Sequence, residues 1–246
     1  VLLKVMVPRD NEIKIDAAEQ MFAAFYSVYH SGFLSFLTPQ EHFSFELAVF
    51  NNEIHFYVSV PKHLKDLVEK QIHGAYPGAE IREVPEYNIF SETGKVAFAS
   101  LRLKSSNYLP IKVFKDLPVD ALSSLTSVLA KMTEGEGAAI QILVSPADSK
   151  WQKQGRSFIA KTKKAEASPE TAKYATDSKT LEAIENKITK PGFNVTIRIV
   201  ATSSTEEGAK AHLSNIIGSF SQFASNQNSF TKNRHLLGFD NPRKAL

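Results

Sequence analysis

The order of predicted elements repeats once along this chain, and that repetition restricts the fold more than any other feature. Residues 1–85 have the pattern strand, helix, strand, strand, helix, strand. Residues 95–240 repeat this order, except that about 45 residues of helical pattern stand where the turn of the second hairpin is expected. The pattern predicts an α+β fold of two tandem ferredoxin-like (βαββαβ) units. Domain 1 is expected at 1–88 and domain 2 at 95–246, with a helical insertion at about 148–191 in its hairpin.

The first hairpin has the clearest local signal. Two segments of alternating polarity, 43–50 and 53–60, flank Asn51 and Asn52. Asparagine tolerates the positive φ that a tight hairpin turn requires, so this pair predicts the turn.

Two helix starts show the spacing of a capping box, in which side chains satisfy the free backbone N–H groups of the first turn. Asp16 precedes Glu19 by three residues, and Ser204 precedes Glu207 by three residues. We therefore expect helices that are capped by Asp16 and by Ser204.

Three weaker expectations concern the second unit. A short strand extension is predicted at 111–114, and a final weak strand within 229–239. A helix is predicted at 119–132, because apolar residues recur there at helical spacing. The residues expected on its inner face are Leu122, Leu125, Leu129 and Met132.

Composition excludes several classes of function. The chain has no cysteine, which excludes disulfides, thiol catalysis and cysteine-bound zinc. Its net charge is only +3, so the case for nucleic acid must rest on local clustering of charge. No apolar run approaches the length of a membrane span. The chain begins directly with a predicted strand, and we expect it to be a piece of a longer protein.

Motifs of catalysis and cofactor binding are missing from the sequence. There is no P-loop, so we expect no ATP or GTP hydrolysis. Gly135-Glu-Gly137 precedes a strand instead of following one, and it predicts a helix stop and no dinucleotide site. His42 and His55 are expected to oppose each other across the first hairpin, as a solvent-facing pair in preference to a metal site. No catalytic residue, metal or cofactor is predicted.

The insertion is the strongest candidate for a functional surface. Its basic residues have no acidic neighbour between them and could contact phosphates, while the single tryptophan could stack on a base. The alternative is a solvated helix face, with Trp151 and Phe158 docked on the sheet and with acids of the next helix neutralising the charge. Those acids are Glu166, Glu170, Glu182 and Glu185. The candidate contact residues are Lys150, Trp151, Lys153, Arg156, Lys161, Lys163 and Lys164.

Several stretches resemble one protein family. They are LKVMVPRDNE (3–12), IDAAEQM (15–21), KQIHGAYPGA (70–79), EGEGAAIQ (134–141), SPADSKWQ (145–152) and KAHLSNI (210–216). Together they resemble the region before the motor in bacterial ATPases that are related to type IV secretion coupling proteins, which pump DNA in conjugation. These stretches carry no catalytic motif, and none of the family's catalytic residues has a matching position here.

The resemblance implies a non-catalytic accessory region of a membrane-anchored ATPase. In that family a membrane helix precedes this region and a P-loop motor domain of the same polypeptide follows it. The implied location is the cytoplasmic face of the inner membrane, where the region would position the motor or contact translocated DNA or protein. Other secretion-system proteins and self-association are further candidate partners.

The alternative is a free-standing module that binds single-stranded nucleic acid on an open ferredoxin-like sheet. The rings that would stack on bases are Phe43, Phe45, Phe56 and Tyr57.

Overall fold

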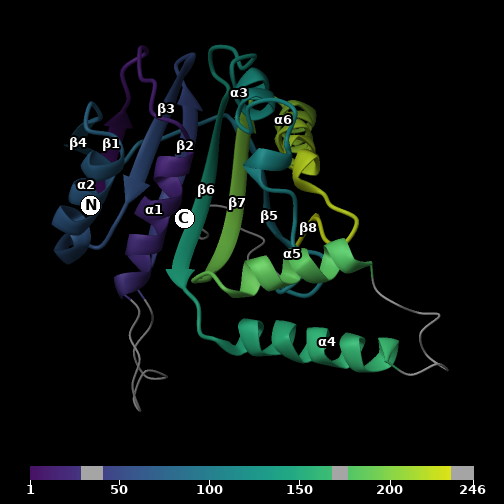
Figure 1. Ribbon diagram of the computed structural model, residues 1–246. Coiled ribbons are helices and arrows are strands. Elements are labelled where there is room, and N and C mark those ends of the chain that lie inside the picture. The colour runs from purple at the N-terminus through teal and green to yellow at the C-terminus, as the bar shows by residue number, and fades with distance from the viewer. Residues whose placement is uncertain (29–40, 168–176, 234–246) are drawn as a thin grey trace.

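A computed structural model describes residues 1–28, 41–167 and 177–233 of the chain (Figure 1). Its strands are β1 (Leu2–Met6), β2 (Phe43–Phe50), β3 (Glu53–Ser59), β4 (Glu80–Val84), β5 (Lys95–Leu103), β6 (Gly137–Pro146), β7 (Phe193–Ser203) and β8 (Phe230–Lys232). Its α-helices are α1 (Asp16–Phe25), α2 (Lys65–Ala75), α3 (Ser123–Leu129), α4 (Lys150–Glu166), α5 (Ser178–Ile188) and α6 (Glu206–Ser219). In the described part of the chain, no helix is both long enough and apolar enough to cross a membrane.

The strands form one eight-stranded sheet in the order β4-β1-β3-β2-β6-β7-β5-β8. Each strand is antiparallel to its neighbours. The four strands of the first half of the chain lie on one side of the sheet, and the four strands of the second half lie on the other. The predicted α+β class is confirmed. The predicted final strand exists as β8, in the first part of the expected range.

The β2–β3 hairpin forms as predicted. Asn51 and Asn52 connect the strands, with φ angles of 51° and 61°. Both residues therefore occupy the left-handed region that two-residue hairpin turns require. The register that follows places Leu47 opposite Phe56 and Val49 opposite Ile54.

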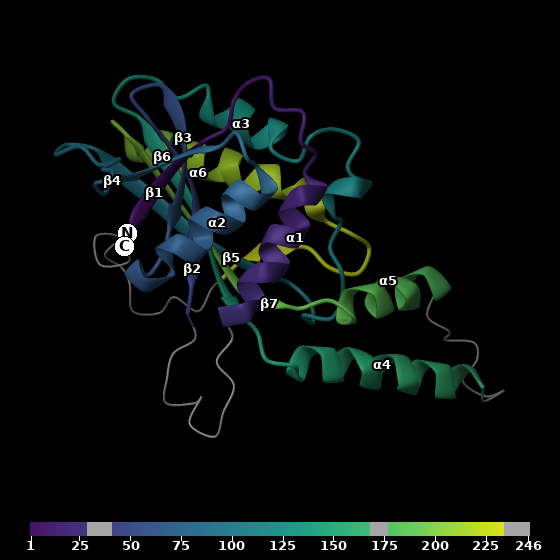
Figure 2. The same ribbon diagram turned by 60° about the vertical axis from the view of Figure 1, so that its left-hand side comes forward.

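Helices α1, α2, α3 and α6 cover one face of the sheet (Figure 2). Phe43 and Val49 are six residues apart on β2, so their side chains point to the same face. The core around Phe43 receives Met21 and Phe25 from α1 and Val68 and Ile72 from α2. The core around Val49 receives Leu125 and Leu129 from α3 and Ala209, Leu213 and Ile216 from α6.

The first helix starts differently from the prediction. Ile15 is the N-cap of α1 and makes no side-chain cap, while Asp16 is the first helical residue. The Asp16 carboxylate pairs with Lys115 at 2.9 Å, and Glu19 pairs with Lys190. The predicted capping box is wrong, because cations that are distant in sequence bind both carboxylates.

The start of α6 is shifted by one residue. Thr205 is its N-cap, and the Thr205 hydroxyl accepts a hydrogen bond from the Gly208 N–H at 3.0 Å. The prediction that Ser204 caps this helix is therefore wrong.

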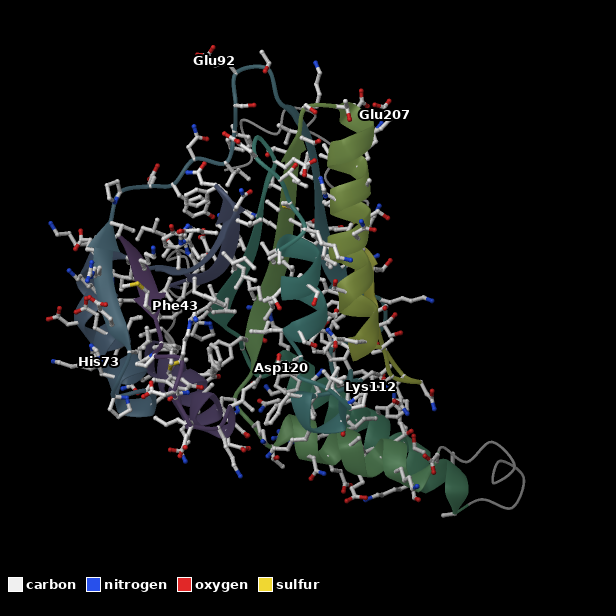
Figure 3. All side chains as sticks on the ribbon, turned by 90° about the horizontal axis from the view of Figure 1, so that it is seen from above. Phe43, His73, Glu92, Lys112, Asp120 and Glu207 are labelled. Atoms are coloured by element: carbon white, nitrogen blue, oxygen red, sulfur yellow. The ribbon has the colours of Figure 1, made fainter. Side chains whose placement is uncertain are left out.

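The third helix is shorter than predicted. The Asp120 carboxylate (labelled in Figure 3) accepts the Leu122 N–H at 2.7 Å, and α3 begins only after this turn. Leu122 is consequently exposed, contrary to its predicted inward position, whereas Leu125, Leu129 and Met132 are buried. The predicted strand extension at 111–114 is also wrong, because this segment leads into a 3-10 helix at Phe114–Asp116.

The two halves of the chain are joined by strand pairing as well as by the segment between β4 and β5. Strands β2 and β6 pair from Phe43↔Val144 to Val49↔Ala138, so the sheet runs from one half into the other. The connection between β4 and β5 lies on the face opposite the helices. There the Tyr87 hydroxyl donates to Glu46 at 2.6 Å, and the Tyr87 ring stacks on Tyr57 with centroids 4.9 Å apart. The two halves of the chain therefore form one continuous sheet.

The insertion enters between β6 and β7, where Pro146 pairs with Phe193. This position and its two-helix content are as predicted. We call α4 and α5 together the helical arm. Figure 1 shows the arm beyond one end of the sheet, with α4 as its outermost helix.

Candidate functional site

A small apolar cluster holds the helical arm together. Ile159 of α4 packs with Leu181, Ile184 and Ile188 of α5. Trp151 and Phe158 border this cluster, and so do Tyr108 and Leu109 from the loop after β5. The arm is therefore attached through a loop and through its own helices, with no sheet residue in its cluster.

Trp151 packs on Gly192, the residue directly before β7. A Cβ atom placed on Gly192 would lie only 2.5–2.6 Å from atoms of the Trp151 ring, so the ring covers this glycine closely. Trp151 is half-buried in this position. The expectation that Trp151 and Phe158 dock on the sheet is wrong, because Phe158 instead contacts Tyr108, with ring centroids 5.3 Å apart.

Polar contacts join α5 to the body of the protein. The Lys187 ammonium donates to the carbonyl oxygens of Asn107 at 2.6 Å and Leu109 at 3.1 Å. Burial lowers the pKa of Lys187 to about 8. The Gln152 amide of α4 donates to the carbonyls of Ile188 and Lys190 at the end of α5.

The predicted basic residues all lie on α4, and they fall into two groups. Lys150 pairs with Asp148 at 3.2 Å, and Lys163 pairs with Glu185 at 2.9 Å. The second group is exposed and makes no ion pair with any residue that the structure describes. Its members are Lys153, Arg156, Lys161 and Lys164.

The expected neutralisation by acids of the second helix is limited to one contact. Glu185 reaches Lys163 as described above, while Glu182 is exposed and forms no ion pair with the described residues. The Glu166 side chain and Glu170 lie outside the described residues. Most of the positive charge on α4 is therefore open to a partner.

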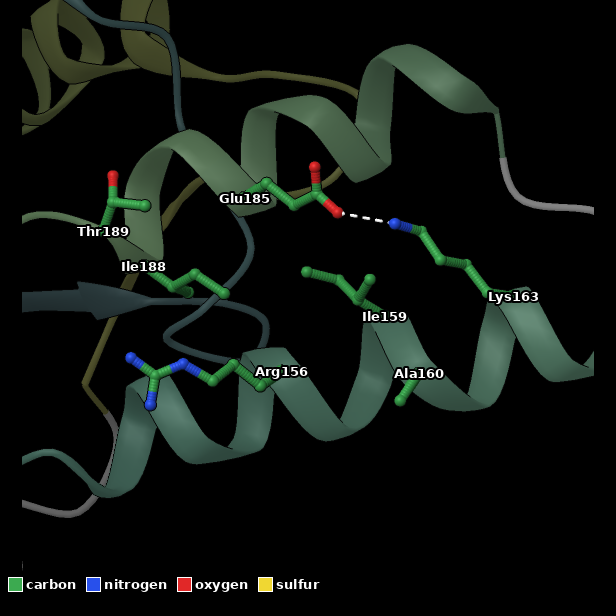
Figure 4. A pocket seen from close by; sticks show the side chains of 7 residues that line it. All are labelled: Arg156, Ile159, Ala160, Lys163, Glu185, Ile188 and Thr189. Atoms are coloured by element: carbon green, nitrogen blue, oxygen red, sulfur yellow. Dashed lines mark hydrogen bonds and ion pairs between the residues drawn. The ribbon is translucent and has the colours of Figure 1, made fainter.

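A shallow groove of about 510 Å³ runs between α4 and α5 (Figure 4). Sequence reasoning missed this groove, because it combines side chains from two helices whose relative position no local pattern fixes. Its lining residues are Arg156, Ile159, Ala160, Lys163, Glu185, Ile188 and Thr189.

A second polar cluster lies in the body, and sequence reasoning missed it as well. The Glu136 carboxylate contacts His212 Nε2 at 2.7 Å and accepts the Ser203 hydroxyl at 3.1 Å. Thr133 donates its N–H and its hydroxyl to the same carboxylate, each at 3.0 Å. Burial alone would raise the pKa of Glu136, but these hydrogen bonds outweigh it and hold the pKa at about 2.

This cluster serves structure better than catalysis. The Ser203 hydroxyl donates to Glu136 and not to His212, so the trio lacks the contact between nucleophile and base that acyl transfer needs. The carboxylate instead ties the turn before β6 to β7 and α6. The only sequence signal was Glu134-Gly-Glu-Gly137, which marked a helix stop.

The histidine pairing across the first hairpin is wrong. His55 lies opposite Ala48, and His42 precedes β2. His55 is buried against Phe50, with ring centroids 4.6 Å apart, and this burial lowers its pKa. Among the described residues, no group of three or more His, Asp or Glu side chains is placed to hold a metal ion.

The rings proposed as a base-stacking platform do not share a free surface. Phe43 is fully buried, and Phe45 packs against Phe22 of α1 with centroids 5.1 Å apart. Phe56 is exposed on the helical side, whereas Tyr57 is buried on the opposite face under Tyr87.

Comparison with known proteins gives one family and distant likenesses to solved structures. One of these structures is described as "Crystal Structure of Aclacinomycin Oxidoreductase", with 12% sequence identity and a TM-score of 0.39. The likeness covers 90% of this chain but only 40% of that chain, so this chain spans well under half of its length. No curated protein matches the sequence. A family model described as "Domain of unknown function (DUF8128)" matches residues 1–233, and the chain belongs to this family.

Proposed function

We propose that this chain is a non-catalytic accessory region of a membrane-anchored ATPase of the type IV secretion coupling class. In this role it lies at the cytoplasmic face of the inner membrane and positions a P-loop motor domain of the same polypeptide. The helical arm is the element that contacts translocated DNA or protein. The sequence stretches given above support the family assignment, and the charge on α4 supports the role of the arm.

The proposal includes an architecture of two tandem ferredoxin-like units. The order β4-β1-β3-β2 of the first four strands supports it, since this is the order that a βαββαβ unit adopts. The remaining strands follow in the order β6-β7-β5-β8, which is the same arrangement read from the other side. In each half, two helices cover the same face.

The observation that carries the proposed contact is the unpaired charge on α4. Lys153, Arg156, Lys161 and Lys164 are exposed on the outermost helix and make no ion pair with described residues. Clustered cations that no protein acid neutralises attract a polyanion and release its counterions on binding. Such binding is independent of nucleotide sequence, because phosphates carry no sequence information.

The free-standing single-strand binder is less well supported. Its stacking platform needs several rings on one open face, but Phe43 is buried under the helices and Tyr57 is buried under Tyr87 on the opposite face. Trp151 is half-buried, and Gly192 covers one side of its ring.

A titration of the purified chain against duplex and single-stranded DNA over a range of salt concentrations tests the proposal. The variant reverses Lys153, Arg156 and Lys161 to Glu. A matched control reverses Lys62, Lys70 and Lys95, which are exposed on the body. Each phosphate contact contributes about 0.9 to the logarithmic salt slope on duplex DNA, so the arm variant is expected to lower the slope by about 2.7.

The control variant is expected to keep the parent slope. Equal effects of the two variants would show that binding follows net charge and not the arm. Absence of DNA binding by the parent chain would remove the DNA contact from the proposal.

A further inference from the structure

The groove between α4 and α5 combines an apolar floor with charged ends. Ile159 and Ile188 form the floor from the two helices, and both are almost fully buried, at 8% and 5% exposure. Ala160 is exposed beside them, and its small side chain leaves the groove open to solvent. Figure 4 shows the Ile159 and Ile188 side chains directed into the space between the helices.

The two ends of the groove differ in charge. At one end, Arg156 makes no ion pair with a described residue. At the other end, Lys163 and Glu185 form an ion pair across the groove at 2.9 Å. Arg156 and Lys163 are seven residues apart on α4, so the groove spans about 10 Å along the helix axis. This length matches about two turns of a bound helix.

We propose that this groove binds a short amphipathic peptide segment with an apolar residue next to an acidic one. The apolar side chain contacts Ile159 and Ile188 over Ala160, and the carboxylate pairs with Arg156. Binding of a helical face in an apolar groove is a common mode of peptide recognition. A guanidinium group can bind a carboxylate through two parallel hydrogen bonds, which orients the peptide as well as holding it.

The floor of the groove favours a peptide over a nucleic acid at this place. Isoleucine side chains give no hydrogen bond to a phosphate or a base edge, and no ring in the groove can stack on a base. The outward lysines Lys153, Lys161 and Lys164 do not line the groove. Arg156 lines the groove and also belongs to the proposed DNA contact, so the two sites on the arm share this residue and differ in the others.

Three labelled synthetic peptides of equal length test this proposal by fluorescence anisotropy. The first carries leucines at helical spacing with flanking glutamates, the second has lysines in place of the glutamates, and the third has serines in place of the leucines. The first peptide is expected to bind about tenfold more tightly than the other two. Equal binding of all three peptides, or binding of none, would overturn the proposal.

Two matched pairs of variants locate the site. Ala160→Trp fills the groove, and Gln154→Trp adds the same ring at an exposed position of α4 that does not line it. Arg156→Gln removes the proposed carboxylate partner, and Lys153→Gln removes a cation outside the groove. The first member of each pair is expected to weaken peptide binding about tenfold, and the second to leave it unchanged.

If Ala160→Trp disturbs folding, as circular dichroism would reveal, the Arg156→Gln and Lys153→Gln pair decides alone. Equal effects of these two variants would contradict a site in the groove. A duplex DNA that loses binding on Ala160→Trp but not on Gln154→Trp would assign the groove to nucleic acid and overturn the peptide proposal. Loss of DNA binding on reversal of the outward lysines, with peptide binding retained, would leave both proposals standing as separate sites.

Discussion

The helical arm is inserted between strands β6 and β7 of the sheet, yet the sheet and the arm are stabilised in different ways. Fifteen buried residues form the larger core of the sheet, whereas four buried residues form the cluster of the arm. Charged groups of the body, such as Glu136 and Lys115, are bound by partners from other elements. Most cations on α4 have no ion-pair partner among the residues that the structure describes. The comparison teaches that the arm leaves its outer charges exposed and depends on few internal interactions.

The largest expected difference in stability between the sheet and the arm comes from one isoleucine in the core of each. Ile199 in β7 and Ile184 in α5 are both at 0% exposure. Ile199→Ala is expected to cost about 4 kcal/mol of global unfolding free energy, since it leaves a cavity between packed layers. Ile184→Ala is expected to cost about 2 kcal/mol, because the small arm cluster can collapse around the gap.

Urea unfolding and amide hydrogen exchange measure this difference. Faster exchange for Ile184→Ala should be confined to α4 and α5, while Ile199→Ala should affect the whole sheet. Uniform exchange effects from both substitutions would mean that arm and sheet unfold as one unit.

Trp151 tests how strongly a partly buried residue stabilises the arm. Trp151 is half-buried on Gly192, which places it between a core residue and a surface residue. Trp151→Ala is expected to cost about 2 kcal/mol and to loosen α4 without unfolding the sheet. Urea unfolding followed by far-ultraviolet circular dichroism checks the value, and exchange rates of α4 amides check the location. A midpoint that equals that of the parent would contradict the packing of the ring.

The body should respond to acid through Glu136. Its pKa of about 2 in the fold lies below the ordinary value of 4.5, so its contribution to stability is complete above about pH 4.5. That contribution is lost as the pH falls toward 2. Glu136→Gln is expected to lower the unfolding free energy at pH 7 on the order of 1–2 kcal/mol, a range that allows for partial solvent screening.

Thermal melts of parent and variant between pH 7 and pH 2 check this expectation. The difference between them should shrink as the pH approaches 2, because the parent carboxyl is then protonated. A difference that stays constant over this range would show that the lost hydrogen bonds, and not the charge, stabilise the cluster.

The smallest effect is expected for the outward charges of the arm. Lys153→Gln and Lys161→Gln are expected to change the unfolding free energy by less than about 0.5 kcal/mol, since neither side chain has an ion-pair partner among the described residues. Chemical denaturation measures this. A loss above about 1 kcal/mol would indicate a structural role for these lysines.

Local chemistry was readable from the sequence, and long-range partners were not. Asn51 and Asn52 specify their turn by backbone preference alone, so the hairpin was predicted correctly. Asp16 was misassigned as a cap because its partner Lys115 is 99 positions away. The Glu136–His212 contact and the groove lined by Arg156 and Glu185 were not predicted for the same reason. Both join elements whose packing no local sequence pattern encodes.

The position of the arm has a mechanical consequence. The arm is inserted between β6 and β7, which are interior strands flanked by β2 and β5. A force that pulls the arm along these strands acts on many backbone hydrogen bonds at once. Breaking them together requires a larger force than breaking the hydrogen bonds of an edge strand one after another. A force applied to α4 would therefore reach the interior of the sheet first, and it would move both halves together before it separated the strands.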